Sequence, residues 1–370
     1  MSNRIQQLYE LGQSVWCDHL SRGMIVSGEL DRLIGLGVVG ITSNPTIFMK
    51  SVTSGHDYDD RLTALPDDLR DIEAYEALVL PDIRDAADHL RPVYDRTDGV
   101  DGYVSLEVNP HLAHDPRGTV EEARRLWGEV DRPNLMIKVP ATPAGIPAIE
   151  TLLSEGINVN VTLIFGLAAY EQVMKAYVAG VDHFRSRGGD VRRLASVASF
   201  FVSRVDSLVD KRLEALGAEG RPIDALPGKA AIANARLAYA AFERTFGSGG
   251  VFSASLSAGA RVQRPLWAST STKNPRYPDT IYVDGLIGPQ TVNTLPPATI
   301  EAFLDHGRPA VTLAGGQEDA RRVMSSLSGL GIRIEHVTDQ LLAEGVKLFS
   351  DSFDELLRNI AQRRRSLARA

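Results

Sequence analysis

Short apolar runs alternate with longer segments of helical periodicity along most of the chain. The runs are continuous in their apolar character, which is typical of parallel strands that are covered on both faces. The segments between them repeat their apolar positions about every three to four residues, as an amphipathic helix does. This pattern predicts an α/β protein built on a parallel sheet.

Eight of the apolar runs are predicted to be strands. Eight is also the number of strand–helix units that closes a (β/α)8 TIM barrel. We therefore expect one barrel domain over residues 1–370, with extra helices and a C-terminal helical extension from about residue 299. The predicted strands cover 14–18, 38–42, 102–108, 135–139, 157–163, 194–201, 265–270 and 280–284.

The helical segments begin at residues with strong positional preferences. Asn, Thr and Ser are favoured N-caps, and Pro is favoured at the first helical position. The predicted starts are Asn44 with Pro45, Thr142 with Pro143, Ser203 before Arg204, and a capping box of Thr119 with Glu122 for the helix that ends at Trp127. The other predicted helices cover 3–11, 27–36, 67–94 and 167–184, with a helical insert at 229–246.

The segment after the eighth predicted strand is expected to be an addition to the barrel. It contains a candidate short strand at 309–313 and a candidate helix at 318–330. A long terminal helix over about 338–360 repeats large apolar residues on one face. We expect this last helix to pack across the mouth of the barrel.

Composition and charge exclude several classes of protein. The 370 residues carry a net charge of -7 with a pI near 5.7, and these values give no sign of a surface for nucleic acid. Its apolar runs are too short to cross a bilayer, and residues 1–7 lack the apolar core of a secretion signal. Cys17 is the only cysteine, which suits a cytoplasmic protein. No cluster of Cys and His has metal-ligand spacing, so no metal is expected.

Lys138 interrupts the buried run at 135–139, where a lysine is unexpected. One interpretation is a cation that reaches solvent from the strand end or pairs with a carboxylate. The other is a desolvated amine that acts as a nucleophile toward a carbonyl group. This stretch alone leaves both interpretations open.

Polar residues recur where the predicted strands end. In a barrel, alternate strand residues face inward and the chemistry lies at the C-terminal strand ends. A single buried polar residue usually forms a satisfied hydrogen bond in the core. Polar residues from six strands that converge on one mouth instead indicate a site. By this periodicity the candidates are Asp18, Asn44, Glu107, Lys138, Asn160, Thr162, Ser199 and Phe201, followed by Ser269, Ser271 and Lys273 after the seventh strand.

Five motifs in order resemble the signatures of transaldolase, a class I aldolase-type barrel enzyme of the pentose phosphate pathway. The resemblance covers nearly the whole chain, and no single motif carries it. The motifs are GITSNPTIF at 40–48, VSLEV at 104–108, NLMIKVPAT at 134–142, INVNVTLIF at 157–165 and QRPLWASTSTKNP at 263–275.

The resemblance implies a covalent mechanism without cofactor or metal. Lys138 would form a Schiff base with the C2 carbonyl of a ketose phosphate, and Asp18 would remove the proton of the C4 hydroxyl. Glu107 and Thr162 would hold the water that carries protons, while Asn44 and Asn160 would bind hydroxyl groups of the three-carbon unit. Donor and acceptor would be the family's sugar phosphates: sedoheptulose 7-phosphate or fructose 6-phosphate, and glyceraldehyde 3-phosphate or erythrose 4-phosphate.

The resemblance also implies a phosphate site. Arg204 would bind the phosphate from one side, near a helix start where backbone N–H groups favour anions. Ser269, Ser271 and Lys273 would bind it from the other side, with Ser199 and Phe201 between them. Many relatives have arginine where this chain has Lys273, so a point charge replaces a bidentate donor. Members of the family occur as dimers, which leaves a homodimer as an open expectation.

Two other functions compete with that of a transaldolase. The nearest rival is a fructose-6-phosphate aldolase, a smaller relative that releases free dihydroxyacetone. The other is a binding or scaffold protein on a degenerate barrel, which would have lost the lysine or a carboxylate.

Each candidate residue also has an interpretation without catalysis. In these structural interpretations, Asp18 and Asn44 are only helix caps, Glu107 only neutralises Lys138, Phe201 belongs to the core, and Arg204 pairs with Asp206 or a neighbouring helix.

Overall fold

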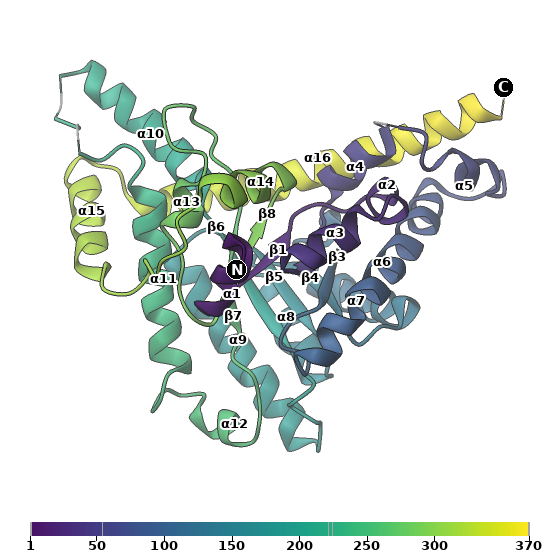
Figure 1. The fold of residues 1–370 in the computed structure, drawn as a ribbon, viewed down its shortest axis with the longest axis horizontal. Coiled ribbons are helices and arrows are strands. Elements are labelled where there is room, and N and C mark those ends of the chain that lie inside the picture. Colours follow the sequence, from purple (N-terminus) through teal and green to yellow (C-terminus); the bar gives the residue numbers. More distant parts are fainter. Residues whose placement is uncertain (1, 54, 221, 224, 369–370) are drawn as a thin grey trace.

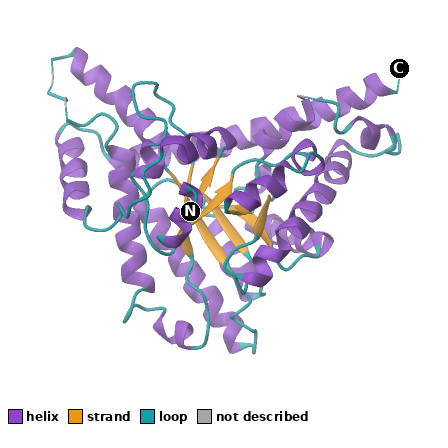
Figure 2. Ribbon diagram, viewed as in Figure 1, coloured by secondary structure: helices purple, strands orange, loops and turns teal. Residues whose placement is uncertain are grey.

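Eight parallel strands close into a barrel at the centre of the molecule, shown in orange in Figure 2. The structure is a computed structural model, and it describes residues 2–53, 55–220, 222–223 and 225–368. Strand order follows chain order, and the last strand pairs with the first. The predicted α/β barrel is therefore confirmed. The strands are β1 (Gln13–Cys17), β2 (Val38–Ile41), β3 (Tyr103–Glu107), β4 (Leu135–Pro140), β5 (Val159–Ile164), β6 (Ser196–Phe201), β7 (Arg264–Ala268) and β8 (Thr291–Leu295).

Helices surround the barrel and continue beyond it at both ends (Figure 1). The helices before β5 are α1 (Arg4–Glu10), α2 (Arg22–Val26), α3 (Glu29–Leu36), α4 (Pro45–Thr53), α5 (Asp59–Thr63), α6 (Asp71–Arg96), the 3-10 turn η1 (Pro110–Leu112), α7 (Pro116–Val130) and α8 (Gly145–Ser154). Those that follow are α9 (Leu167–Ser186), α10 (Ser203–Ala218), α11 (Ala230–Phe246), α12 (Ser253–Ser257), α13 (Ile281–Asp284), α14 (Pro297–His306), α15 (Gln317–Gly329) and α16 (Ile334–Leu367).

The prediction of the eighth strand at 280–284 is wrong. These residues form the single helical turn α13, in which Tyr282 and Val283 are buried. The true strand β8 has a more polar sequence. Hydrogen bonds inside the protein satisfy its polar side chains except at Asn293 Nδ2, which has no partner among the described residues. Thr270 donates to Asn293 Oδ1 at 2.9 Å, for example. The short strand predicted at 309–313 is also wrong, because this segment is a loop that donates two backbone hydrogen bonds to Ile287 O.

Several predicted helix starts also need correction. The capping box at Thr119 is wrong, because α7 begins at Pro116 and Asp115 accepts from Gly118 N. Ser203 is the first residue of α10 and not its cap. The helix after Thr142 begins at Gly145, although the Thr142 hydroxyl still accepts from the first helical N–H group at 2.9 Å.

The segment predicted as a helical insert is α11, which lies in the layer of helices around the barrel. It packs against α9, α15 and β7. The preceding helix α10 instead contacts α11 and α16. Helix α10 is therefore the addition between β6 and β7, and Figure 1 shows it projecting away from the strands.

The terminal helix α16 crosses the C-terminal ends of the strands from α15 toward α5 (Figure 1). It contacts α4, α5, α6 and α10 along its length. Buried apolar residues on one side, including Phe349 and Phe353, make this contact. The helix is longer than the sequence predicts, and it places part of its apolar face over the barrel mouth.

A buried carboxylate organises the opposite, N-terminal end of the barrel. Asp101 accepts hydrogen bonds from Ser14 Oγ at 2.8 Å and Trp16 Nε1 at 3.1 Å, and it pairs with Arg264 at 2.9 Å. Trp16 fills the barrel so closely that a Cβ atom on Gly40 would lie 2.5 Å from its ring. Glycine at this position is thus a requirement of packing.

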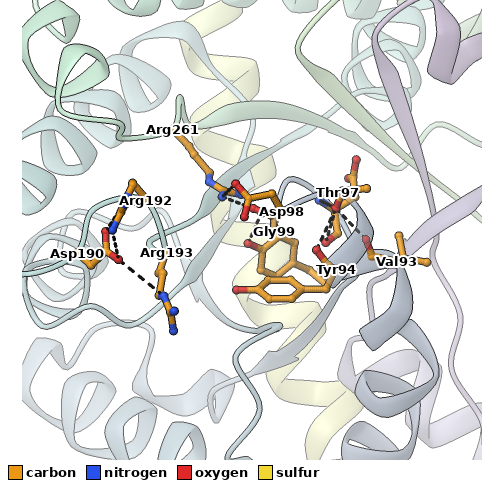
Figure 3. A network of polar contacts seen from close by, with 11 residues as sticks. Val93, Tyr94, Thr97, Asp98, Gly99, Asp190, Arg192, Arg193 and Arg261 are labelled. Atoms are coloured by element: carbon orange, nitrogen blue, oxygen red, sulfur yellow. Dashed lines mark hydrogen bonds and ion pairs between the residues drawn. The ribbon is translucent and has the colours of Figure 1, made fainter.

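Figure 3 shows a second polar network, which includes Arg261, Asp98 and Gly99. Arg261 points toward the segment at Asp98 and Gly99 and donates to the Asp98 carbonyl oxygen. Its guanidinium also lies 3.6 Å from the Asp98 carboxylate, whose side chain is fully exposed. Asp98 and Asp101 are therefore a matched pair of carboxylates in opposite environments.

Replacing Asp101 with Asn is expected to lower the free energy of unfolding by about 3 kcal/mol, because Arg264 would be left as an uncompensated, mostly buried charge. Urea denaturation measures the effect. Asp98→Asn is the control and is expected to cause no measurable change, because surface pairs contribute little. Equal stability of the two variants would contradict the role given to Asp101.

Within the residues that the structure describes, no helix has the length and apolar character that a membrane crossing requires.

Candidate active site

A cavity of about 310 Å³ lies at the C-terminal ends of the strands, beneath α16. Ten of the twelve predicted site residues line it, and the exceptions are Glu107 and Asn160. The lining residues are Asp18, Thr42, Asn44, Thr46, Ile47, Lys50, Lys138, Thr162, Ser199, Phe201, Arg204, Ala268, Ser269, Ser271, Lys273, Thr294, Pro296, Leu348 and Phe349. The mouth of the barrel is thus polar on most sides, with an apolar cover from α16.

Lys138 lies on β4 with its amine at the bottom of this cavity. The residue is only 5% exposed. Its Nζ donates to the Ser43 carbonyl oxygen at 2.9 Å and lies 3.4 Å from Glu107 Oε2. The ring of Phe349 from α16 lies 6.0 Å from the same nitrogen. The amine is therefore held inside the barrel and does not extend into solvent.

Glu107 lies on β3, next to Lys138, because the two residues are register partners in the pairing of β3 with β4. Its side chain is buried, and burial raises the pKa of the carboxyl above its usual range, while Lys138 acts in the opposite direction. Among the described residues, neither Glu107 Oε2 nor the buried Thr162 Oγ1 has a hydrogen-bond partner. Two buried oxygen atoms that receive no hydrogen bond from the described residues are suited to share a water molecule.

The backbone is strained beside Thr162. Leu163, the next residue on β5, has a φ of 58°, which is rare for a residue with a branched side chain. The pairing between β5 and β6 shifts between Val161 and Ile164. Such strain is concentrated at functional sites, where the surrounding structure maintains it.

Asp18 follows β1 on another side of the cavity. Thr42 Oγ1 lies 2.7 Å from Asp18 Oδ1 and 2.6 Å from Thr294 Oγ1. Burial raises the pKa of Asp18 above its usual range, while the hydrogen bond from Thr42 and the charge of Lys138 lower it. The site therefore contains two carboxylates in different surroundings, which is the arrangement that separates the roles of an acid and a base.

The two predicted amides differ in their access to the cavity. Asn44 lines it and also caps α4, because its Oδ1 accepts from Ile47 N at 3.0 Å. Asn160 is 0% exposed and lies one layer deeper. It donates to Ser105 Oγ at 3.0 Å and accepts from Ser199 Oγ at 2.7 Å.

Three cations gather on the side of the cavity formed by α4, α10 and the loop after β7: Lys50, Arg204 and Lys273. Lys273 Nζ donates to Ser271 Oγ at 2.6 Å, and the Arg204 guanidinium lies 5.7 Å from the centre of the Phe201 ring. Burial lowers the pKa of both Arg204 and Lys273. Within the described parts of the chain, none of the three cations pairs with a carboxylate. This side of the cavity is therefore suited to an anion.

The structural interpretation that pairs Arg204 with Asp206 is wrong. Asp206 instead accepts from Ala231 N at 2.7 Å and Tyr282 Oη at 3.0 Å. Ser269 lies near the same helix start, with a φ of 56° and its Oγ 3.0 Å from Ser203 Oγ.

Among the lining residues that the sequence interpretation missed are Thr42, Thr294, Lys50, Leu348 and Phe349. Thr42 ends a predicted strand and could have been noticed by its position. Thr294 was missed because the eighth strand was predicted at 280–284, whereas Thr294 lies on the true strand β8. Nothing local marks Lys50, which lies on α4, or the two residues of α16, because their approach to the site depends on tertiary packing.

No group of three or more His, Cys, Asp or Glu side chains in the described residues is arranged to hold a metal ion.

Comparisons with known proteins agree with this geometry. The family model described as Transaldolase/Fructose-6-phosphate aldolase matches residues 15–360. The chain is 51% identical over 371 residues to the "Transaldolase" of Parafrankia sp. (strain EAN1pec), with all of both chains covered. It is 51% identical to the "Transaldolase" of Thermobifida fusca (strain YX), with 98% of each chain covered. It is 47% identical to the "Transaldolase 2" of Streptomyces coelicolor, with 100% of this chain and 99% of that one covered.

Proposed function

The chain belongs to the transaldolase/fructose-6-phosphate aldolase family, and we propose that it transfers a dihydroxyacetone unit from a ketose phosphate to an aldose phosphate through a Schiff base on Lys138. The main support for this mechanism is the buried amine of Lys138, which lies at the bottom of a polar cavity and 3.4 Å from the Glu107 carboxylate. Covalent catalysis of this kind divides one difficult transfer into two easier steps.

In the first step, Lys138 attacks the C2 carbonyl carbon of the ketose phosphate as a neutral amine. The resulting carbinolamine loses water and becomes an iminium ion. Glu107 is the proposed proton carrier, because it is the carboxylate beside the amine and burial raises its pKa. A water molecule bound by Glu107 and Thr162 would pass the protons, since each has a buried oxygen atom that receives no hydrogen bond from the described residues.

In the second step, Asp18 removes the proton of the C4 hydroxyl group. The C4 oxygen then forms a carbonyl, the C3–C4 bond breaks, and its electron pair flows into the iminium ion. The products are a free aldose phosphate and a three-carbon enamine on Lys138. Because the iminium ion accepts the electrons, the proposed reaction needs no cofactor or metal.

The acceptor aldose phosphate then follows the same path in reverse. The enamine carbon attacks the acceptor carbonyl, and Asp18 returns its proton to the new hydroxyl oxygen. Water hydrolyses the iminium ion and releases the lengthened ketose phosphate. Microscopic reversibility requires that the same groups act in both directions.

The remaining residues are proposed to bind the substrate. Asn44 is assigned the hydroxyl groups of the three-carbon unit, and Asn160 supports this part of the site through Ser199, since it lies one layer below the surface. The phosphate is assigned to the cationic side, with Arg204 opposite Lys273. Phe201, Ser269 and Ser271 complete that wall.

A fructose-6-phosphate aldolase is the alternative within the same family. It would release dihydroxyacetone to water and would not transfer it to an acceptor. The full-length similarity to proteins that carry the name transaldolase favours transfer.

One assay distinguishes these two activities. Fructose 6-phosphate and erythrose 4-phosphate are supplied together, and the expected product is sedoheptulose 7-phosphate, with little free dihydroxyacetone. Accumulation of dihydroxyacetone, or no conversion of fructose 6-phosphate, would contradict transaldolase activity.

We further propose that the protein works in the cytoplasm as a homodimer. The single buried thiol, Cys17, is compatible with a reducing compartment. Dimers are the assembly that the family resemblance implies, and light scattering of the purified protein tests it.

A further inference from the structure

Two buried carboxylates on α10 connect the cationic side of the cavity to the rest of the fold. Asp206 is 1% exposed and Asp210 is 6% exposed, although the proposed mechanism uses neither. A buried carboxylate is costly unless several donors satisfy it. The hydrogen-bond partners of these two residues therefore indicate what they do.

Each carboxylate joins α10 to the same two segments of the chain. Asp206 accepts from Ala231 N at 2.7 Å and from Tyr282 Oη at 3.0 Å. Asp210 accepts from Gly228 N at 2.9 Å and from Tyr277 Oη at 2.7 Å. The backbone donors lie at the start of α11 (Ala231) and just before it (Gly228), and both tyrosines belong to the connection between β7 and β8.

The contact at Tyr277 requires a glycine beside it. Gly228 has a φ of 71°, and a Cβ atom there would lie 2.8 Å from the Tyr277 ring. The tyrosine thus packs directly against the backbone before α11. A substitution of this glycine would displace the ring from its position beside Asp210.

The connection between β7 and β8 carries Ser271 and Lys273. Its beginning is attached to the first residue of α10, because Ser203 N donates to Ser269 O at 3.0 Å. Its middle part is attached to the same helix through the two tyrosines. Lys273 lies between these attachments, and Arg204 lies within the first turn of α10. Both cations of the proposed phosphate site are therefore held by one helix.

This attachment opposes an electrostatic repulsion. Arg204 and Lys273 carry like charges, and the charge of Arg204 is among the causes that lower the pKa of Lys273. In the absence of an anion, this repulsion favours movement of the loop away from α10. A loop held by buried hydrogen bonds keeps the two cations in place before the substrate binds, which increases affinity by reducing the cost of ordering.

We propose that Asp206 and Asp210 are positioning residues that hold Lys273 opposite Arg204, through Tyr282 and Tyr277, so that the site is organised for the substrate phosphate. This inference rests on the proposed function and extends it to residues outside the cavity. It differs from a general structural role, because it predicts a loss of affinity for phosphate without a loss of Schiff-base formation.

The test removes single hydroxyl groups. Tyr277→Phe and Tyr282→Phe are each expected to raise the KM for fructose 6-phosphate and the inhibition constant of inorganic phosphate about tenfold, as is typical for losing a hydrogen bond to a charged group. The kcat value and the trapping of unphosphorylated dihydroxyacetone on Lys138 by borohydride are expected to change less than about twofold. Tyr103→Phe is the matched control and should change neither constant, because Tyr103 Oη donates to Gly99 O, which lies outside the connection between β7 and β8.

Arg204→Gln separates failure of this proposal from failure of the phosphate assignment. If Arg204→Gln weakens inhibition by phosphate while both tyrosine variants match the wild type, the positioning role is wrong and the phosphate site remains. If Arg204→Gln has no effect, both the phosphate site and the positioning role are wrong. An equal loss of dihydroxyacetone trapping in the tyrosine variants would indicate general structural damage and would also overturn the proposal.

Discussion

Fructose 6-phosphate followed by borohydride is expected to leave a three-carbon adduct on Lys138. The amine is buried at the bottom of the cavity, and its nearest carboxylate is the proposed proton carrier Glu107. Reduction converts the three-carbon iminium ion, which forms when the enamine gains a proton, into a stable secondary amine that mass spectrometry can locate. A three-carbon mass, as opposed to a six-carbon one, would establish nucleophile, cleavage and retained fragment in one experiment.

Replacing Lys138 with Met is expected to reduce kcat/KM by roughly 10^4-fold or more, since loss of a covalent nucleophile removes the whole reaction path. Lys50→Met is the matched control, because Lys50 lines the same cavity from α4 but lies outside the proposed covalent step. The control should still form the adduct on Lys138. An adduct on another lysine, or near-normal turnover of Lys138→Met, would return Lys138 to the interpretation of a paired cation at a strand end.

The order of strands and the position of Lys138 could be predicted from sequence because both depend on local patterns. A continuous apolar run marks a strand that is covered on both faces, and an interrupting lysine then stands out. The same reasoning failed at β8. The run from Thr280 to Asp284 is apolar because Tyr282 and Val283 are buried in a helical turn, whereas β8 contains Asn293 and Thr294. Hydrophobicity reports burial, and burial alone does not distinguish a strand from a turn.

The candidate site divides in a similar way. Residues at strand ends, such as Asp18 and Thr162, could be predicted because barrel geometry brings every strand end to one mouth. Phe349 could not, since its position over Lys138 depends on how α16 packs across the barrel. The attachment of Tyr277 to Asp210 is equally invisible in the sequence, because it joins side chains 67 positions apart through packing alone.

Replacing Asp18 with Asn should separate Schiff-base formation from bond cleavage. Lys138 and Glu107 remain in place, so the iminium ion with fructose 6-phosphate can still form. Without a base for the C4 hydroxyl group, the C3–C4 bond persists and borohydride should trap a six-carbon phosphate adduct. Turnover is expected to fall roughly 10^2- to 10^4-fold, the usual contribution of a general base. A three-carbon adduct formed at the normal rate would exclude Asp18 from the cleavage step.

The pH dependence gives an independent test of Asp18. A base must be ionised, and burial raises the pKa of this carboxyl. As pH falls through that raised pKa, the carboxylate is lost, so kcat/KM should decline at a higher pH than the ordinary aspartate pKa of about 3.9 would give. Thr42→Val should move this decline to still higher pH, because the hydrogen bond from Thr42 to Asp18 favours the ionised form.

The control separates Asp18 from Glu107. Since burial also raises the pKa of Glu107, the same pH profile of kcat/KM is measured in Glu107→Gln. If the acidic decline and its shift by Thr42→Val persist there, they belong to Asp18, and if Thr42→Val leaves the decline unmoved, another group limits the reaction.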